Sequence, residues 1–230
     1  MRKMWFNNML LVLVLIISSC KNVSIEKGEL CSVKVSGVEF TKSLNDAKAT
    51  ATVEDGKLVL KSNAKCDNFN DPNGKLSNNT APVLLTKVQN YKPFTFSAKV
   101  TPAFKDKYDA GTMYIYLNQN CWFKFAFERD ERSRTRAVTV RTNETSDDNN
   151  HDIIDKTSIY MKISSDTKTV GFYYSVDKKN WQLVRVFRND YPAELWLGFS
   201  TQSPVGKGTT ATFEDCSLTQ SSVTDFRMGI

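Results

Sequence analysis

The sequence predicts an all-β protein, a sandwich of antiparallel sheets. Most of its 230 residues fall into short runs in which apolar and polar side chains alternate, as expected for strands whose successive side chains point to opposite faces of a sheet. About a dozen such runs are separated by turn residues, and none keeps a 3.6-residue apolar stripe, so helices are not expected. No repeat or linker divides the chain.

The first residues predict export rather than fold. Arg2 and Lys3 precede an apolar run, Met9–Ile17, which has about half the roughly 20 residues needed to span a membrane. Cys20 follows Ser-Ser and resembles a bacterial lipoprotein box. The resemblance implies that residues 1–19 are a signal peptide and that Cys20 is lipidated, although an ordinary signal with a chance Cys is the alternative.

The expected organisation follows from this start. Residues 20–29 are a tether that anchors the protein by lipid to the bacterial cell envelope, at the outer membrane, 30–220 form the sandwich, and 221–230 are a C-terminal tail. The net charge of +6 is spread among interspersed acidic and basic residues, so we expect no nucleic-acid partner. We expect a monomer.

Export makes disulfides possible for the four remaining cysteines, Cys31, Cys66, Cys121 and Cys216. They allow three pairings. Cys31–Cys216 is preferred because first and last strands are often neighbours in sandwiches, and four free thiols remain the alternative. No C-x-x-C pair occurs and His151 is the only histidine, which argues against zinc.

The first part of the domain predicts five strands and one long loop. A strand lies within 30–40, and Asp55-Gly56 marks a hairpin between 49–53 and 58–60. Residues 62–82 form a polar loop of a length that is often functional. Strands at 83–88 and 94–100 follow.

The central stretch, 108–148, predicts a hairpin with two unlike faces. One face is apolar and carries Met113, Ile115, Leu117, Cys121, Phe123, Phe125 and Phe127. The other carries Tyr114, Tyr116, Trp122, Lys124 and Glu128. Rings, an ammonium and a carboxylate on one face suit a polar ligand. A polar loop with Ser146, Asp147 and Asp148 follows.

Further strands are predicted at 159–163, 170–175, 181–187, 194–200 and 209–218. Ser175, Asp177 and Trp181 form a turn motif that resembles an Asp-box. A single copy is interpreted as structural, because Asp side chains bond turn backbones.

Ordered motifs between 62 and 218 resemble one family of bacterial and fungal proteins. They include Cys66-Asp67-x-Phe69-x-Asp71-Pro72, Tyr108-Asp109-Ala110-Gly111, Trp122-x-Lys124-x-x-x-Glu128, Ser146-Asp147-Asp148, Tyr174-Ser175-x-Asp177-x-x-x-Trp181 and Gln202-Ser203-Pro204. This family is the domain of unknown function 1349, related to the yeast regulation of enolase protein. The resemblance implies a concanavalin A-like jelly roll of two antiparallel sheets. Lys178 and Arg141 depart from the family's pattern.

These residues lead to a carbohydrate-binding hypothesis for a non-catalytic envelope lipoprotein. Trp122 and Tyr114, with Tyr116 beside them, would stack on sugar rings over a concave face. Lys124, Glu128 and Arg141 would bond hydroxyls, with Asp67 and Asp147 at the rim. The simpler alternative is a surface Lys–Glu pair beside a half-buried Trp that covers the sheet.

Other functions stay open. A glycoside-acting enzyme would use Glu128 with Asp67 or Asp147, since such hydrolysis needs two carboxyls. A structural or adaptor lipoprotein would bind an envelope protein instead. No cofactor and no metal site are expected, with calcium held by loop carboxylates as the alternative.

Overall fold

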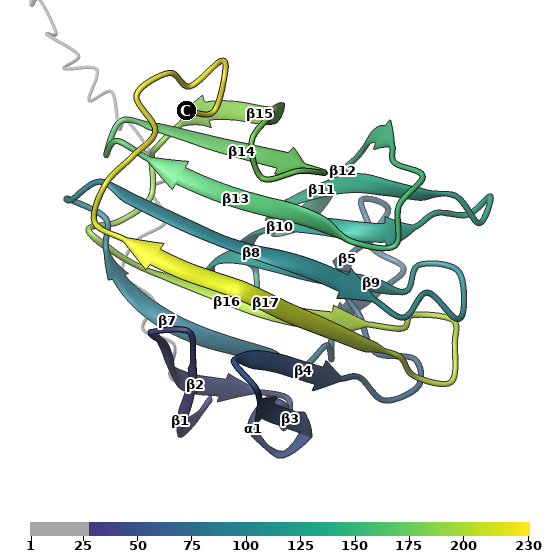
Figure 1. The fold of residues 1–230 in the computed structure, drawn as a ribbon. Coiled ribbons are helices and arrows are strands. Elements are labelled where there is room, and N and C mark those ends of the chain that lie inside the picture. Colours follow the sequence, from purple (N-terminus) through teal and green to yellow (C-terminus); the bar gives the residue numbers. More distant parts are fainter. Residues whose placement is uncertain (1–27) are drawn as a thin grey trace, which may run out of the picture.

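The computed structural model describes residues 28–230, and the expected signal peptide and Cys20 lie outside this range. Two large antiparallel sheets face each other (Figure 1). The eight-stranded sheet has the order β1 (Glu29–Val35), β2 (Val38–Leu44), β7 (Val83–Gln89), β16 (Glu194–Gln202), β9 (Ala110–Asn118), β10 (Cys121–Arg129), β11 (Thr135–Asn143) and β12 (Thr145–Ile153). The predicted all-β sandwich is confirmed.

The second sheet has seven strands. Their order is β15 (Gln182–Arg188), β14 (Thr169–Ser175), β13 (Ile159–Ser165), β8 (Phe94–Pro102), β17 (Thr210–Thr219), β4 (Lys57–Lys61) and β3 (Ala51–Glu54). One short helix, α1 (Ala47–Thr50), precedes β3. The predicted Asp55-Gly56 hairpin is confirmed as β3–β4, with both turn residues at positive φ.

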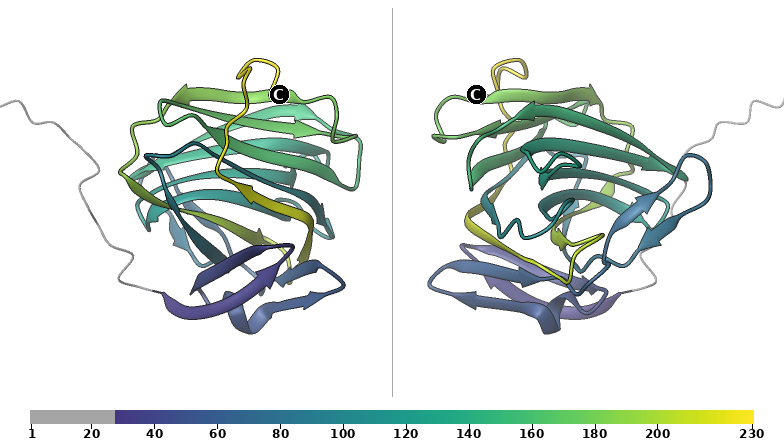
Figure 2. Two further views of the ribbon diagram at one scale, coloured as in Figure 1. Left: turned by 60° about the vertical axis from the view of Figure 1, so that its left-hand side comes forward. Right: turned by 90° about the vertical axis from the view of Figure 1, so that its right-hand side faces the viewer.

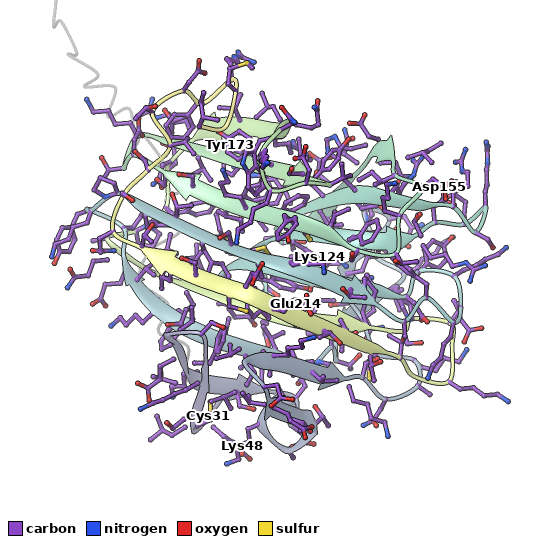
Figure 3. The ribbon with its side chains drawn as sticks, in the orientation of Figure 1. Cys31, Lys48, Lys124, Asp155, Tyr173 and Glu214 are labelled. Atoms are coloured by element: carbon purple, nitrogen blue, oxygen red, sulfur yellow. The ribbon has the colours of Figure 1, made fainter. Side chains whose placement is uncertain are left out.

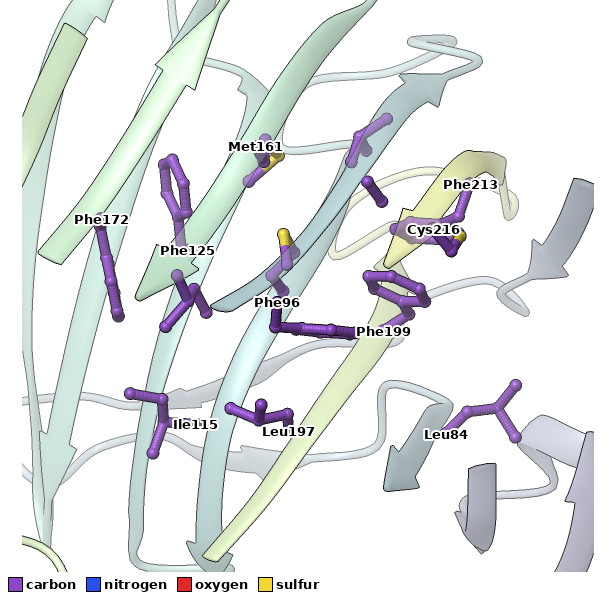
Figure 4. Close-up of a cluster of buried hydrophobic side chains, with 14 of the residues drawn as sticks. Leu84, Phe96, Ile115, Phe125, Met161, Phe172, Leu197, Phe199, Phe213 and Cys216 are labelled. Carbon is purple, nitrogen blue, oxygen red and sulfur yellow. The ribbon is translucent and has the colours of Figure 1, made fainter. Parts of the chain in front are cut away.

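The main core lies between the two sheets and follows the predicted alternation of β9 and β10. Phe123, Phe125 and Phe127 are at most 1% exposed and belong to it. Phe199 of β16 bridges the layers, with ring centroids 4.4 Å from Phe213 and 4.7 Å from Phe96 (Figure 4). Full burial of such side chains is worth about 1.5–3 kcal/mol each.

A second, smaller apolar cluster lies on the outer face of the eight-stranded sheet, the face turned away from the seven-stranded sheet. Its buried members are Val83, Leu85, Ala110, Tyr114, Tyr116, Trp122, Ala126, Val138 and Val140. Phe69 packs against it from a small hairpin, β5 (Asn68–Asn70) and β6 (Ser77–Asn79). The right-hand view of Figure 2 shows this hairpin projecting beside the sheets. The predicted long loop therefore covers part of the sheet.

The polar stretch after β11 is a strand rather than the predicted loop. β12 pairs with β11 and ends the eight-stranded sheet, with Thr142 opposite Ser146 and Val140 opposite Asp148. Most of its side chains are exposed. Polar residues suit an edge strand because they oppose pairing with other chains. The strand was not predicted because its sequence lacks the alternation of apolar and polar residues.

The last residues, 221–230, lie against the seven-stranded sheet. The Val223 amide donates to Ser164 Oγ at 3.0 Å, and the Tyr173 hydroxyl donates to the Phe226 carbonyl at 2.9 Å. Lys162 Nζ donates to the Gly229 carbonyl at 2.8 Å. Figure 1 shows this segment running from β17 towards β14 and β15. The segment expected to be a tail thus covers the sheet.

Three further observations complete the fold. Cys31 and Cys216 are free thiols, so the preferred disulfide between them is wrong. The Cys31 Sγ instead donates to the Phe40 carbonyl at 3.3 Å.

The turn at Asp177 is held by its own side chain, which accepts hydrogen bonds from the Lys179 and Asn180 amides. Lys178 adopts φ 63° there, the left-handed conformation that glycine adopts most easily. No helix within 28–230 is both long and apolar enough to cross a membrane.

Candidate functional site

A buried ammonium, Lys124 on β10, is the centre of the candidate site. It is 2% exposed and points to the outer face of the eight-stranded sheet. Its Nζ donates to Asp67 Oδ1 at 3.2 Å, to the Asn68 carbonyl at 2.9 Å and to Gln202 Oε1 at 2.9 Å. An ammonium has three donors, so its hydrogen-bonding capacity is filled.

The pKa of Lys124 is raised above its ordinary value. Burial is the largest single effect and would lower it, but Asp67, Tyr114 and Glu128 together raise it by more. Asp67 lies at the start of the β5–β6 hairpin, and its own backbone carbonyl accepts the Thr80 and Ala81 amides. The ion pair therefore joins the hairpin to the sheet.

Glu128, two residues beyond Ala126 on the same strand, extends the network. Gln202 Nε2 donates to its Oε2 at 3.2 Å, and the side chain is 7% exposed. Burial raises its pKa to about 8, with Asp148 and Asp67 adding to the rise and Lys124 opposing it. At neutral pH the carboxyl is thus mostly protonated and can donate a hydrogen bond.

Tyr108 is hydrogen-bonded to this network, and Asp148 interacts with it electrostatically near the surface. Asp148 lies opposite Val140 on β12, and its side chain is exposed. Desolvation raises the pKa of its carboxyl, while Lys124 lowers it and Asp67 raises it. The Tyr108 carbonyl accepts from Gln202 Nε2 at 3.3 Å, and its ring is partly exposed. Polar groups thus extend from the buried ammonium to the surface.

The three aromatic residues of this face are not open platforms. Tyr114 is 0%, Trp122 1% and Tyr116 6% exposed. The Tyr114 and Trp122 rings meet edge to face at 5.8 Å, and Phe69 of the hairpin packs against the same cluster. The prediction that these rings offer their faces to a sugar is therefore wrong, because the loop at 62–82 folds over them.

Arg141 and Asp147 do not belong to this site. They pair with each other across β11 and β12, and Arg141 pairs with Phe123 of β10. They therefore point to the face opposite Lys124, and both are exposed. A one-residue change of register reverses the face of every side chain on a strand. The prediction that they border the site is wrong, and Asp148 takes the place assigned to Asp147.

Sequence reasoning missed two members of the network, Gln202 and the Asn68 carbonyl. Gln202 ends β16, whose Gln202–Ala110 pairing places it next to β9. Its motif, Gln202-Ser203-Pro204, was visible in the sequence, but nothing there connected it to Lys124. No group of three or more His, Cys, Asp or Glu side chains within 28–230 is arranged to hold a metal ion.

Residues 44–221 match DUF1349, described as a protein of unknown function. The chain belongs to the DUF1349 family. The match covers every strand from β3 to β17 and all residues of the Lys124 network. No curated protein matches the sequence.

Solved structures show the same fold. A functionally unknown protein from Saccharomyces cerevisiae is 20% identical, with a TM-score of 0.71, over 87% of this chain and 100% of that one. The GH43 protein BlXynB from Bacillus licheniformis is 14% identical, with a TM-score of 0.58, over 76% of this chain and 35% of that one. The Bacteroides ovatus xyloglucan PUL GH43B protein is 14% identical, with a TM-score of 0.56, over 76% of this chain and 35% of that one. This DUF1349 chain spans about a third of the two GH43 proteins, and these likenesses establish the fold alone.

Proposed function

We propose that this DUF1349 protein binds neutral carbohydrate at the outer face of its eight-stranded sheet, as a lipoprotein anchored in the bacterial cell envelope through Cys20. The observation that supports it is the hydrogen-bonded network of Lys124, Gln202 and Glu128, which interacts electrostatically with the exposed Asp148. Convergent polar groups with shifted pKa values beside an apolar surface are typical of ligand sites.

The network is more polar than the fold requires. Apolar residues in place of a buried ion pair are often as stable or more stable, so stability alone does not explain Lys124 and Asp67. Glu128 and Asp148 give the ligand a protonated donor and an acceptor close together. Sugar hydroxyls need both kinds of partner, whereas an anionic ligand would meet the carboxylates of Asp67 and Asp148.

The recognition expected here depends on hydrogen bonds and not on ring stacking, since Trp122 and Tyr114 are buried. Titration calorimetry against neutral plant, host and microbial oligosaccharides tests the proposal. Asp148→Asn is expected to weaken binding about tenfold, the effect of one lost charged hydrogen bond. Asp147→Asn is the matched control, one residue away on the opposite face, and should leave binding unchanged.

Two results would reject the proposal: no binding of any neutral glycan by the wild-type protein, or equal losses in the Asp147 and Asp148 variants. Thermal unfolding of each variant separates a folding defect from lost binding. Globomycin treatment of cells, which blocks lipoprotein signal cleavage, together with Cys20→Ala tests the anchor. If Cys20 is modified, globomycin should make the uncleaved, lipid-bearing precursor accumulate, and Cys20→Ala should abolish lipid attachment.

One observation favours a second candidate function, a glycoside-acting enzyme. A protonated Glu128 near an ionised carboxylate has the form of an acid–base pair. Asp67 or Asp148 would be the partner, and Asp147 is excluded by its position on the opposite face. Glu128→Gln should then abolish release of sugar from a polysaccharide while binding persists, whereas the binding hypothesis predicts no release by the wild-type protein.

A further inference from the structure

A hollow lies at one end of the sandwich, on the other side of β10 from the Lys124 network. It has a volume of about 800 Å³, within the roughly 300–1,000 Å³ of small-molecule sites. Its lining comes from the β8–β9, β10–β11 and β12–β13 connections and from the strand ends beside them, with Arg129, Arg134, Asp155 and Lys156 as its charged members. We call it the end groove. Figure 3 shows Asp155 beside the loops at this end.

The end groove has an excess of positive charge. Three of its lining residues are cations and one is a carboxylate. Arg134 is paired with the buried Asp130, Nη2 to Oδ2 at 2.9 Å. The Arg129 guanidinium donates to the Phe104 carbonyl at 2.8 Å, and neither Arg129 nor Lys156 forms an ion pair with any residue of 28–230. Two cations therefore remain available to a ligand.

The shape of the end groove is fixed by its own hydrogen bonds. Asp130 accepts the Arg132 and Arg134 amides at 2.9 and 2.8 Å, which holds the β10–β11 turn. On the other wall, Thr135 Oγ1 donates to the Ile154 carbonyl at 2.5 Å. The Phe104 ring packs edge-on against Phe127 at 5.0 Å. A preformed site loses less free energy in ordering when a ligand binds.

The end groove also has an apolar wall. Ile153 is 54% exposed although it is a large hydrophobic side chain, and it lines the groove together with Phe104. Hydroxyls of Ser133 and Thr157 lie among the same residues. An occupant should therefore have an anionic group, an apolar face and hydroxyls, and a carboxylated sugar has all three.

We propose that the end groove binds an acidic oligosaccharide, whose carboxylate pairs with Arg129 and Lys156 and whose ring lies on Ile153. This site is separate from the Lys124 network. Glu128 and Arg129 are consecutive on β10 and so point to opposite faces of the sheet. Acidic and neutral saccharides thus bind at two different places on this chain.

The test is an NMR titration of the isoleucine-methyl-labelled protein with trigalacturonate, with maltotriose as a neutral probe and sodium sulfate as a bare anion. Trigalacturonate should shift the Ile153 methyl, and its affinity should fall as salt increases. Arg129→Gln should weaken binding about tenfold and Lys156→Gln about fivefold. Lys168→Gln, an exposed lysine in the turn at the opposite end of β13, should have no effect.

Several outcomes would overturn the proposal. If maltotriose bound as tightly as trigalacturonate, the site would not recognise the carboxylate charge. If sulfate bound as tightly as trigalacturonate, the site would not recognise the sugar. Unchanged affinity in Lys156→Gln would exclude the end groove as the binding site. The Lys156 side chain forms none of the hydrogen bonds that shape the groove, so this variant should keep its structure. Glu128→Gln changes the Lys124 network but not the end groove, so it should not change trigalacturonate binding. The proposal for the end groove can therefore be rejected or kept independently of the proposal for the Lys124 network.

Discussion

Two buried lysines, one on each sheet, are held in opposite ways. Lys124 on the eight-stranded sheet is 2% exposed and Lys162 on the seven-stranded sheet is 8% exposed. The pKa of Lys124 is raised because Asp67, Tyr114 and Glu128 together outweigh the lowering effect of burial. Burial lowers the pKa of Lys162 to about 8, since its Nζ has the Gly229 carbonyl and the Trp181 ring, 3.5 Å from the ring centroid, as partners.

The difference separates a charged network from a covered surface. A carboxylate near an ammonium favours the charged form, whereas a carbonyl and a ring compensate only part of the lost hydration. Lys124 therefore belongs to a set of ionised and titrating groups that reaches solvent at Asp148. Lys162 instead fixes the last residues of the chain on the sheet, through Gly229.

The largest expected contrast comes from replacing each lysine by methionine. Lys124→Met should lower the free energy of unfolding by about 3–5 kcal/mol, because Asp67 and Gln202 lose their donor in a buried site. Lys162→Met should change it by about 1 kcal/mol at most, since no carboxylate is left unpaired. Urea denaturation measures both. Equal losses would show that the two sites do not differ in this way.

The pH dependence of stability sharpens the comparison on the side of Lys124. The Glu128 pKa of about 8 lies above its ordinary value of 4.5, so the folded state holds this proton more tightly than the unfolded state. Its contribution to stability is fully present below pH 4.5 and is lost as the pH rises towards about 8. Glu128→Gln should therefore become more stable relative to the wild type between pH 5 and 9. Urea unfolding at intervals of pH measures this, and a constant difference would contradict it.

Direct titration of the two ammonium groups is a third test. After reductive ¹³C-methylation, the NMR signal of Lys162 should titrate near pH 8, while Lys124 should stay protonated throughout that range. A Lys162 midpoint at the ordinary lysine value of 10.5 would contradict the lowered pKa.

The smallest expected effect comes from the Trp181 ring. Trp181→Leu keeps an apolar side chain over Lys162 and removes the cation–π contact, worth about 0.5–2 kcal/mol. The pKa of Lys162 should fall below that of the wild type, because the ring stabilises the charged form. The same NMR titration measures it. An unchanged midpoint would show that the ring acts only by covering Lys162.

Alternation along single strands made much of this molecule predictable. The faces of β9 and β10 are as the sequence indicated, with Phe123 in the main core and Lys124 on the outer face. Local spacing is sufficient for that result, because period two belongs to the strand itself. Local spacing does not carry over from one strand to the next, because the length of the turn decides which side chains of the next strand point to which face. This is why Arg141 and Asp147 were placed on the wrong face.

Coverage of the outer face could not be read from the sequence either. Residues 62–82 contain few apolar side chains, and only Phe69 indicates that the segment packs on the sheet. Its position depends on hydrogen bonds to residues far away in the sequence, such as the one that the Asn70 amide donates to Ser146 Oγ at 2.9 Å. Hydrogen bonds between segments so far apart leave no local pattern.

The Lys124 network also has a consequence for the time course of folding. Its ammonium contacts residues 57, 56 and 78 positions away along the chain. Contacts of such separation form slowly, since a long loop must close before they are made. The network should therefore assemble after the β9–β10 hairpin, whose partners are close in sequence. During refolding, the candidate site would be among the last parts of the sandwich to become native.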